Sequence, residues 1–175
     1  MKTALIMLAA LAGVILLALV VLGIQSRSMA PSERSGNRLP PCPASPNCVN
    51  SEYPDAAAHY IAPLTLAEGT DAARVLPWLA RRVRELGGRI RIEQDDYLAA
   101  TFSSRLFGFV DDLQLRLEPA QRVVHIRSAS RVGHGDLGVN RRRVEALRGG
   151  WQHSLGVQSD TVPAGVVQER TVTGE

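Results

Sequence analysis

The sequence is short of the residue types on which several classes of function depend. Only two of its 175 residues are cysteines, Cys42 and Cys48, so a four-ligand zinc site would also need histidines, whose spacing does not resemble a metal motif. Lys2 is the single lysine, and the other 19 of the 20 basic residues are arginines. The whole chain has 17 acids and a formal net charge of +3; without the N-terminal segment, residues 25–175 hold the 19 arginines and the 17 acids, a formal charge of +2. That balance excludes the strongly basic face of a general nucleic-acid-binding protein. We therefore expect no metal and no nucleic-acid partner.

Sequence signatures of common enzyme classes are also missing. We recognise no Walker A loop, no Gly-x-Ser-x-Gly, no His-Glu-x-x-His and no Rossmann fingerprint. Internal repeats are absent as well. These absences give no reason to expect a cofactor.

Charge is absent from Ala4 to Ile24, an unbroken apolar run. At a rise of about 1.5 Å per residue, this run forms a helix roughly 30 Å long, the thickness of the hydrocarbon core of a bilayer. A cleaved signal peptide is a competing interpretation, but its apolar stretch usually has about 7–15 residues, fewer than this run. The nearest small-x-small cleavage site, residues 28–30, is followed by Pro31, which is a poor context for cleavage. A lipoprotein signal needs a cysteine directly after the run, where none occurs. We therefore expect an uncleaved transmembrane anchor.

The sequence gives less direct evidence for the side of the membrane on which the C-terminal domain lies. Lys2 precedes the apolar run, whereas Arg27, Arg34 and Arg38 follow the anchor, which we place at residues 1–26. Taken alone, the positive-inside count favours a cytoplasmic domain. A very short leading tail followed by an apolar run is, however, how signal anchors begin. We therefore expect a single-pass protein of the inner (cell) membrane with a periplasmic C-terminal domain.

A polar stretch rich in Ser and Pro follows the anchor and predicts a flexible linker over residues 27–41. Cys42 and Cys48 come next, separated by prolines and an asparagine that favour turns. In an oxidising compartment the two residues can form a small disulfide loop. Free thiols, or half of a metal site, are the alternatives.

Apolar periodicity predicts one α+β domain over residues 42–155. The first helix is expected to be capped by Thr70 and to end at Gly87-Gly88, and a second helix is expected near the C-terminal end. The two helices are predicted at residues 71–86 and 141–152, and four alternating strands at residues 89–93, 97–102, 111–118 and 123–130. Residues 59–66 are either an edge strand or an extended entry segment.

The order α-β-β-β-β-α predicts a mostly antiparallel four-stranded sheet that the two helices cover on one face, because each strand has one apolar side. The opposite, polar face is then expected to be open, either solvated or docked by a partner chain. Its expected residues are Arg91, Glu93, Thr101, Gln114, Arg116, His125 and Arg127. Residues 156–175 are weakly patterned and are expected to form a loosely ordered tail.

Glycines and arginines are concentrated between Arg127 and Arg148. Three arginines at 141–143 fall in the first turn of the expected helix, where the partial positive charge of free N–H groups disfavours cations. On a structural interpretation, Arg127 and Arg131 pair with Asp111 or Asp112, while Asp136 and Asn140 organise the turn, with Asn140 as the helix cap. On the other, the glycine turn and the arginines form an anion site. Its candidate residues are Arg127, Arg131, Asp136, Asn140, Arg141 and Arg143.

A hydrolase is the alternative function. His134 and Asp136 form a His-x-Asp pair close in sequence to Ser128 and Ser130. Hydrolysis would need a nucleophile within reach of a base and an oxyanion hole, and neither serine lies in a nucleophile-elbow pattern.

Three stretches resemble the family catalogued as domain of unknown function 1499: CPASPNCVNS (residues 42–51), GFVDDLQLRLE (108–118) and IRSASRVGHGDLGVNRRRVEAL (126–147). The similarity runs from about Leu39 to Leu147, with one small departure at Asn50, where serine is more common. Members of this family are generally bacterial or plastid envelope-type proteins, often behind a signal or membrane segment. The resemblance implies one domain and an envelope location, and it carries no catalytic residue over to this chain.

From the sequence we thus expect a membrane-anchored envelope protein without catalytic activity. The bilayer is its expected partner at the anchor. A further partner, either an envelope protein or a small anionic ligand, is expected at the loop from Arg131 to Arg143.

Overall fold

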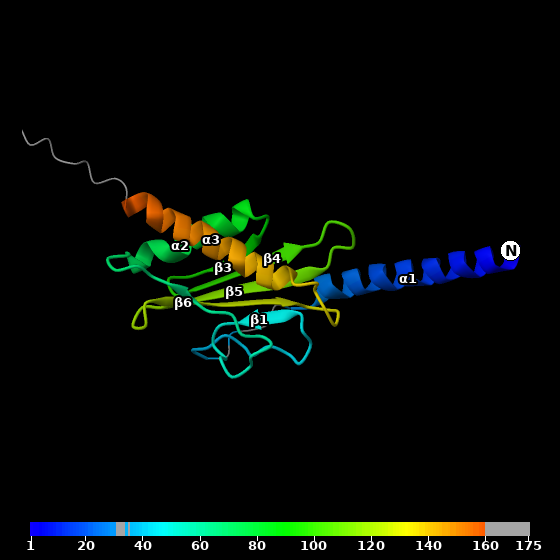
Figure 1. Cartoon of the computed structure of the whole chain (residues 1–175), viewed down its shortest axis with the longest axis horizontal. Helices are drawn as coiled ribbons and strands as arrows, with labels where there is room; N and C mark the ends of the chain where they lie inside the picture. Colours follow the sequence, from blue (N-terminus) through cyan, green and yellow to red (C-terminus); the bar gives the residue numbers. More distant parts are fainter. Residues whose placement is uncertain (31–33, 35, 160–175) are drawn as a thin grey trace, which may run out of the picture.

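A computed structural model describes residues 1–30, 34 and 36–159, with side chains as far as Gln152. The expected loose tail therefore lies outside the described residues, except for its first positions, which belong to a helix. The described chain forms one long helix followed by an α+β domain, as predicted (Figure 1).

The first helix, α1 (Lys2–Ser28), projects away from the domain (Figure 1). Residues 4–24 hold no charged side chain and no proline, so nothing in them breaks the helix or requires water. The helix is long and apolar enough to cross a membrane. Its side chains are exposed along most of its length, and the fully buried positions, Gly23 and Ser26, lie in its last turns, where the helix meets the domain.

The domain is built on one antiparallel sheet with the strand order β1-β6-β5-β4-β3, while β2 also pairs with β6. Four of its strands match the predicted ones closely: β3 (Arg89–Glu93), β4 (Tyr97–Ser103), β5 (Val110–Glu118) and β6 (Val123–Ser130). The count of four was nevertheless too low in the described chain, because β1 (Cys48–Asn50) and β2 (Leu64–Thr65) also join the sheet along β6. Both are too short to show an alternating pattern.

Two helices cover the apolar face of the sheet, α2 (Ala72–Glu85) and α3 (Val139–Ser159) (Figure 1). The cap of α2 is Asp71 instead of Thr70, since the Asp71 carboxylate accepts a hydrogen bond from the Ala73 amide at 3.0 Å. At the other end of the domain sequence, α3 continues to Ser159, past the predicted end at Gln152.

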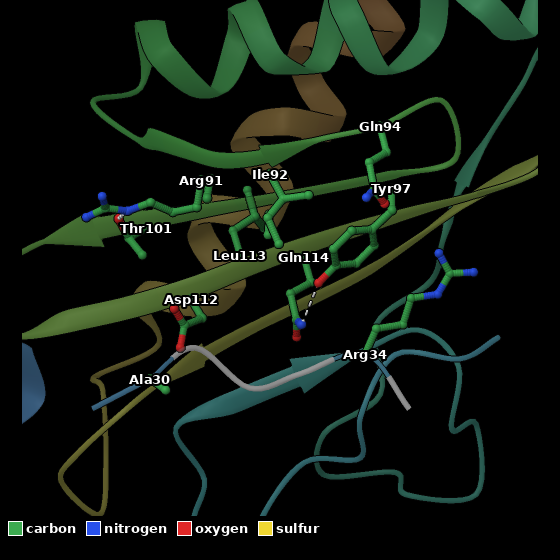
Figure 2. A pocket seen from close by; sticks show the side chains of 12 residues that line it. Ala30, Arg34, Arg91, Ile92, Gln94, Tyr97, Thr101, Asp112, Leu113 and Gln114 are labelled. Atoms are coloured by element: carbon green, nitrogen blue, oxygen red, sulfur yellow. Dashed lines mark hydrogen bonds between the residues drawn. The ribbon is translucent and has the colours of Figure 1, made fainter. Parts of the chain in front are cut away.

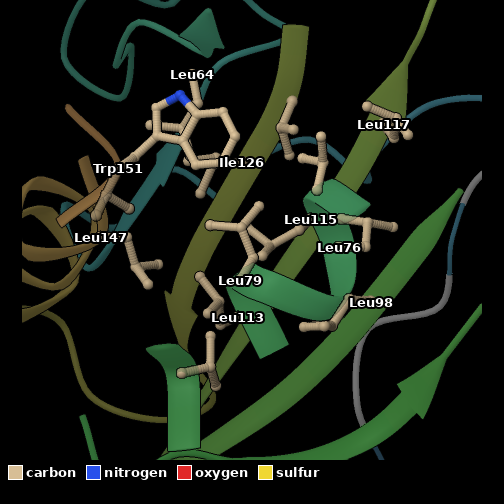
Figure 3. Packing of buried hydrophobic residues seen from close by; sticks show 14 of the residues in the cluster. Leu64, Leu76, Leu79, Leu98, Leu113, Leu115, Leu117, Ile126, Leu147 and Trp151 are labelled. Atoms are coloured by element: carbon tan, nitrogen blue, oxygen red, sulfur yellow. The ribbon is translucent and has the colours of Figure 1, made fainter. Parts of the chain in front are cut away.

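Leucines from the helices and the strands interlock in the core between these layers (Figure 3). Leu79 of α2, Leu98 of β4 and Leu113 of β5 are fully buried, and each such side chain stabilises the fold by roughly 2 kcal/mol. Trp151 of α3 packs edge to face on Trp78, with ring centroids 5.2 Å apart, and its indole N–H donates to the Thr65 carbonyl at 3.0 Å. The core thereby joins α3 to the short strand β2.

Over β5 and β6 the opposite face of the sheet is covered, contrary to the prediction of an open face, whereas Arg91 on the edge strand β3 is exposed. Gln114, Arg116 and Arg127 on this face are 1%, 8% and 4% exposed. Leu39, which was expected in the flexible linker, lies over them and is fully buried in a small cluster with Tyr97 and Ala99. Residues 36–47, together with the chain after β1, therefore act as a third layer on the polar side.

Candidate functional site

The loop after β6 was the expected ligand site, and its arginines are engaged by acids of β5. Arg131 donates from Nε and Nη2 to the two carboxylate oxygens of Asp112, at 2.9 and 2.8 Å, and both side chains are almost fully buried. Its third nitrogen, Nη1, donates to the carbonyls of Ser26 and Met29 at the end of α1. Arg131 therefore connects the sheet to the end of α1.

Arg143 is engaged in the same way. Its Nη2 donates to Asp111 at 2.6 Å, its Nη1 donates to Ser128 Oγ at 2.8 Å, and its guanidinium lies 4.3 Å above the Phe102 ring centroid. A guanidinium that is desolvated and stacked in this way holds neighbouring elements together, here α3 against the sheet. In the structure Asp111 and Asp112 hold the positions in which we expected a ligand's oxygens.

Asp136 resolves the question of how arginines are tolerated at a helix start. Its carboxylate accepts hydrogen bonds from the amides of Gly138 and Asn140, at 2.9 and 2.8 Å. Burial raises the pKa of Asp136, but these hydrogen bonds outweigh it and the net direction is downward. The negative charge compensates the helix dipole and the nearby cations. Asn140 was expected to be the cap; it instead lies inside the first turn of α3.

Gly133, Gly135 and Gly138 of this loop have the G-x-G-x-x-G spacing of a dinucleotide-binding fingerprint, so the statement that the sequence has no such fingerprint was wrong as to spacing. The structure argues against that chemistry here. The strand before the loop belongs to an antiparallel sheet, whereas the fingerprint opens a parallel βαβ unit. The Asp136 carboxylate also occupies the amides that a phosphate would need.

The remaining candidates are dispersed. Arg141 is exposed and donates to the Tyr60 carbonyl at 3.0 Å. Arg127 is buried on β6 itself, where Nη1 donates to Gln114 at 3.1 Å and Nε has no hydrogen-bond partner among the described residues. Burial lowers the pKa of Arg127, and Asp112 offsets this only in part. His134 is exposed and makes no hydrogen bond or ion pair with the described residues.

Two residues in and after the cysteine loop, Asn47 and Glu52, hold the domain together and were not among the expected site residues. Cys42 and Cys48 form a disulfide, one of the alternatives considered, and Asn47 inside it donates to the Gly133 carbonyl at 2.7 Å. Glu52 is buried and accepts from Arg116 Nε at 2.7 Å and from the Leu39 amide at 2.9 Å. The only signal for these roles was the run of polar residues directly after the cysteines.

A cavity of about 380 Å³ is the feature best suited to a ligand (Figure 2). It lies between the polar face of the sheet and the chain that leaves α1. Tyr97, Ala99 and Ile92 supply an apolar wall, and Ile92 is 43% exposed. The full lining comprises Ala30, Arg34, Arg91, Ile92, Gln94, Tyr97, Ala99, Ala100, Thr101, Asp112, Leu113 and Gln114.

Two cations stand at opposite ends of this cavity (Figure 2). Arg34 stacks 5.6 Å from the Tyr97 ring centroid and pairs with Asp96 at 3.0 Å. Arg91 is exposed and donates to Thr101 Oγ1 at 3.1 Å, and it has no ion pair with another described residue. Burial raises the pKa of Tyr97, whose hydroxyl accepts from Gln114 at 2.8 Å, so the phenol stays neutral. The cavity therefore combines apolar walls with one uncommitted positive charge.

Comparison with known proteins gives a family for the domain. No curated protein matches the chain. The family model described as "Protein of unknown function (DUF1499)" matches residues 38–150, which begin just before Leu39 and end within α3. The chain therefore belongs to the DUF1499 family.

Proposed function

We propose that the protein is a membrane-anchored binding module without catalysis, and that its cavity holds an amphiphilic ligand with an anionic end. The observation that carries the proposal is the position of the cavity: Ala30, two residues beyond the end of α1, forms part of its wall. A ligand that leaves the bilayer beside α1 would meet this wall first.

The lining supports an amphiphile. The cavity's volume of about 380 Å³ lies at the lower end of the range of about 300–1,000 Å³ that is typical of small-molecule pockets. Ala99 and Ile92 suit an aliphatic chain, and Arg91 offers an unpaired guanidinium to a carboxylate or phosphate. The anionic ligand expected from the sequence is thus retained, but at a different site from the loop after β6.

The geometry supports binding over hydrolysis. Asp136 faces the amides of Gly138 and Asn140, and no hydrogen bond joins it to His134 among the described contacts. Ser128, a candidate nucleophile by sequence, is fully buried and bonded to Asn140 and Arg143. The alternative hydrolase therefore lacks an assembled base and nucleophile in the described residues.

The disulfide supports a periplasmic location, on the outer side of the inner membrane. Cys42 and Cys48 are bonded, and such bonds persist in oxidising compartments. With α1 as the anchor, this location places the mouth of the cavity at the outer leaflet.

Photolabelling with a diazirine-bearing long-chain fatty acid tests the proposed site on the full chain in membranes. We expect labelling of the peptide that carries Ile92 and Ala99, and competition by unlabelled fatty acid. Ala99→Phe fills the cavity and should remove most of this labelling, while Arg91→Gln should weaken it. Labelling of α1 by the same fatty acid dissolved in the bilayer serves as the internal reference.

Ala120→Phe is the matched control, because Ala120 is exposed in the turn after β5. It should leave the labelling of β3 and β4 unchanged. Equal labelling of the wild-type chain, Ala99→Phe and Ala120→Phe would show that the cavity is not the binding site.

A further inference from the structure

The loop between β4 and β5, residues 104–109, is packed directly on the end of α1. A Cβ added to Gly23 would lie 2.1 Å from the Phe107 carbonyl oxygen, so only glycine allows this approach. Ser26 Oγ accepts a hydrogen bond from the Val110 amide at 2.8 Å, and the Arg27 guanidinium lies beside Gly108. The loop is therefore fixed to the helix at a known height.

That height coincides with the end of the apolar run. Gly23 is the last residue but one of the apolar run that ends at Ile24. If α1 spans a bilayer, which the proposed function also assumes, a loop that touches Gly23 lies at the boundary between hydrocarbon and headgroups. The loop tip is at Leu106, whose side chain is 81% exposed.

A second loop, residues 131–138, presents a similar residue at the same end of the domain. Leu137 is 93% exposed, and Arg131 at the start of this loop is bonded to the carbonyls of Ser26 and Met29. Figure 1 shows both loops at the end from which α1 leaves. Outside α1, the other exposed large hydrophobic side chains among the described residues are only 40–43% exposed. The two most exposed leucines of the domain thus flank the membrane-side helix.

We propose that these two loops form a second contact with the bilayer, in which Leu106 and Leu137 enter the interfacial region on either side of α1. Arg105 and Arg142 are exposed next to them and would meet anionic headgroups. An anionic lipid surface is the partner that this edge fits, because it offers apolar and negatively charged groups at the height that α1 fixes.

Environment-sensitive labelling tests this contact. The full chain, with Cys42–Cys48 oxidised, is labelled with NBD at Leu106→Cys or Leu137→Cys and reconstituted into vesicles of phosphatidylcholine and phosphatidylglycerol. We expect blue-shifted NBD emission and quenching by nitroxide-labelled lipid at both positions. Gln121→Cys is the matched control: Gln121 is exposed in the β5–β6 turn, at the far end of β5, roughly 30 Å away at the usual rise of a strand. It should show neither effect.

Val14→Cys in the middle of α1 separates the anchor from the loops. Quenching at position 14 without quenching at 106 and 137 would overturn the loop contact while leaving the anchor intact. Loss of quenching at position 14 would overturn both. Protection of 106 and 137 from aqueous iodide without lipid quenching would mean that protein covers them, which also contradicts the proposal.

Discussion

At the scale of single residues, His125 is the side chain at which we expect the stability of the domain to respond to pH. It lies half-buried on β6, with Nδ1 3.3 Å from Ser51 Oγ, and burial lowers its pKa below the ordinary value of 6.5. Glu52 and Glu118 act against this, and Arg116 and Arg38 act with it. The folded protein therefore resists a proton that the unfolded chain accepts.

The free energy of unfolding should consequently fall as the pH drops through 6.5, the ordinary pKa of histidine. Above that pH both states are neutral at this residue and it has no effect. His125→Gln should reduce the decline, as measured by urea unfolding of the full chain in detergent at about pH 7.5 and about pH 5.5. His134→Gln, at an exposed position, is the control. An equal decline in both variants would show that His125 is not responsible.

At the scale of the elements, the ion pair between Asp112 of β5 and Arg131 of the loop after β6 should contribute more to the free energy of unfolding than the buried charge of Arg127 on β6. Arg131→Met leaves Asp112 buried without its bidentate partner, which typically costs about 3–5 kcal/mol. Arg127→Met removes a buried cation that has no ion pair among the described residues and should cost only about 1 kcal/mol, for its hydrogen bond to Gln114. Chemical unfolding of both variants measures the difference, and equal losses would contradict it.

The elements also show what the sequence could and could not reveal. Strands β3 to β6 were predictable because Leu113, Leu115 and Leu117 and their counterparts alternate with polar residues. The polar face looked open because burial of Gln114 and Arg116 depends on distant partners, such as Glu52 and Leu39. No local pattern encodes such pairing across the fold. A stretch rich in Ser and Pro has the composition of a linker whether or not it packs against the sheet.

The candidate site illustrates the same limit. Pairing of Arg131 with Asp111 or Asp112 was one of the two interpretations of the sequence, and the structure shows it with Asp112. The sequence did not indicate that the partner of Asp111 would be Arg143 of α3, or that Arg127 would have no ion pair among the described residues. The cavity was not predicted at all, because its walls come from β3, β4, β5 and the chain after α1. Only the fold brings Ala30 and Ala99 to one space.

At the scale of the whole molecule, Gly23 should decide how firmly α1 is joined to the domain. Gly23→Ala places a methyl group against the Phe107 carbonyl, so the loop at residues 104–109 must move away from the helix. We expect faster hydrogen exchange at the Val110 amide, which donates to Ser26. Gly13→Ala is the control, since nothing lies within 4 Å of that position. Unchanged exchange in both variants would mean that the joint tolerates displacement.

If α1 spans a bilayer, its direct joint to the sheet makes the tilt of the domain depend on the membrane. A helix whose apolar length exceeds the local hydrocarbon thickness leans to compensate. Because Gly23, Ser26 and Arg131 connect α1 to the sheet without an intervening hinge, the sheet leans with it. Lipid composition would then set the angle at which the cavity mouth beside Ala30 faces the headgroups.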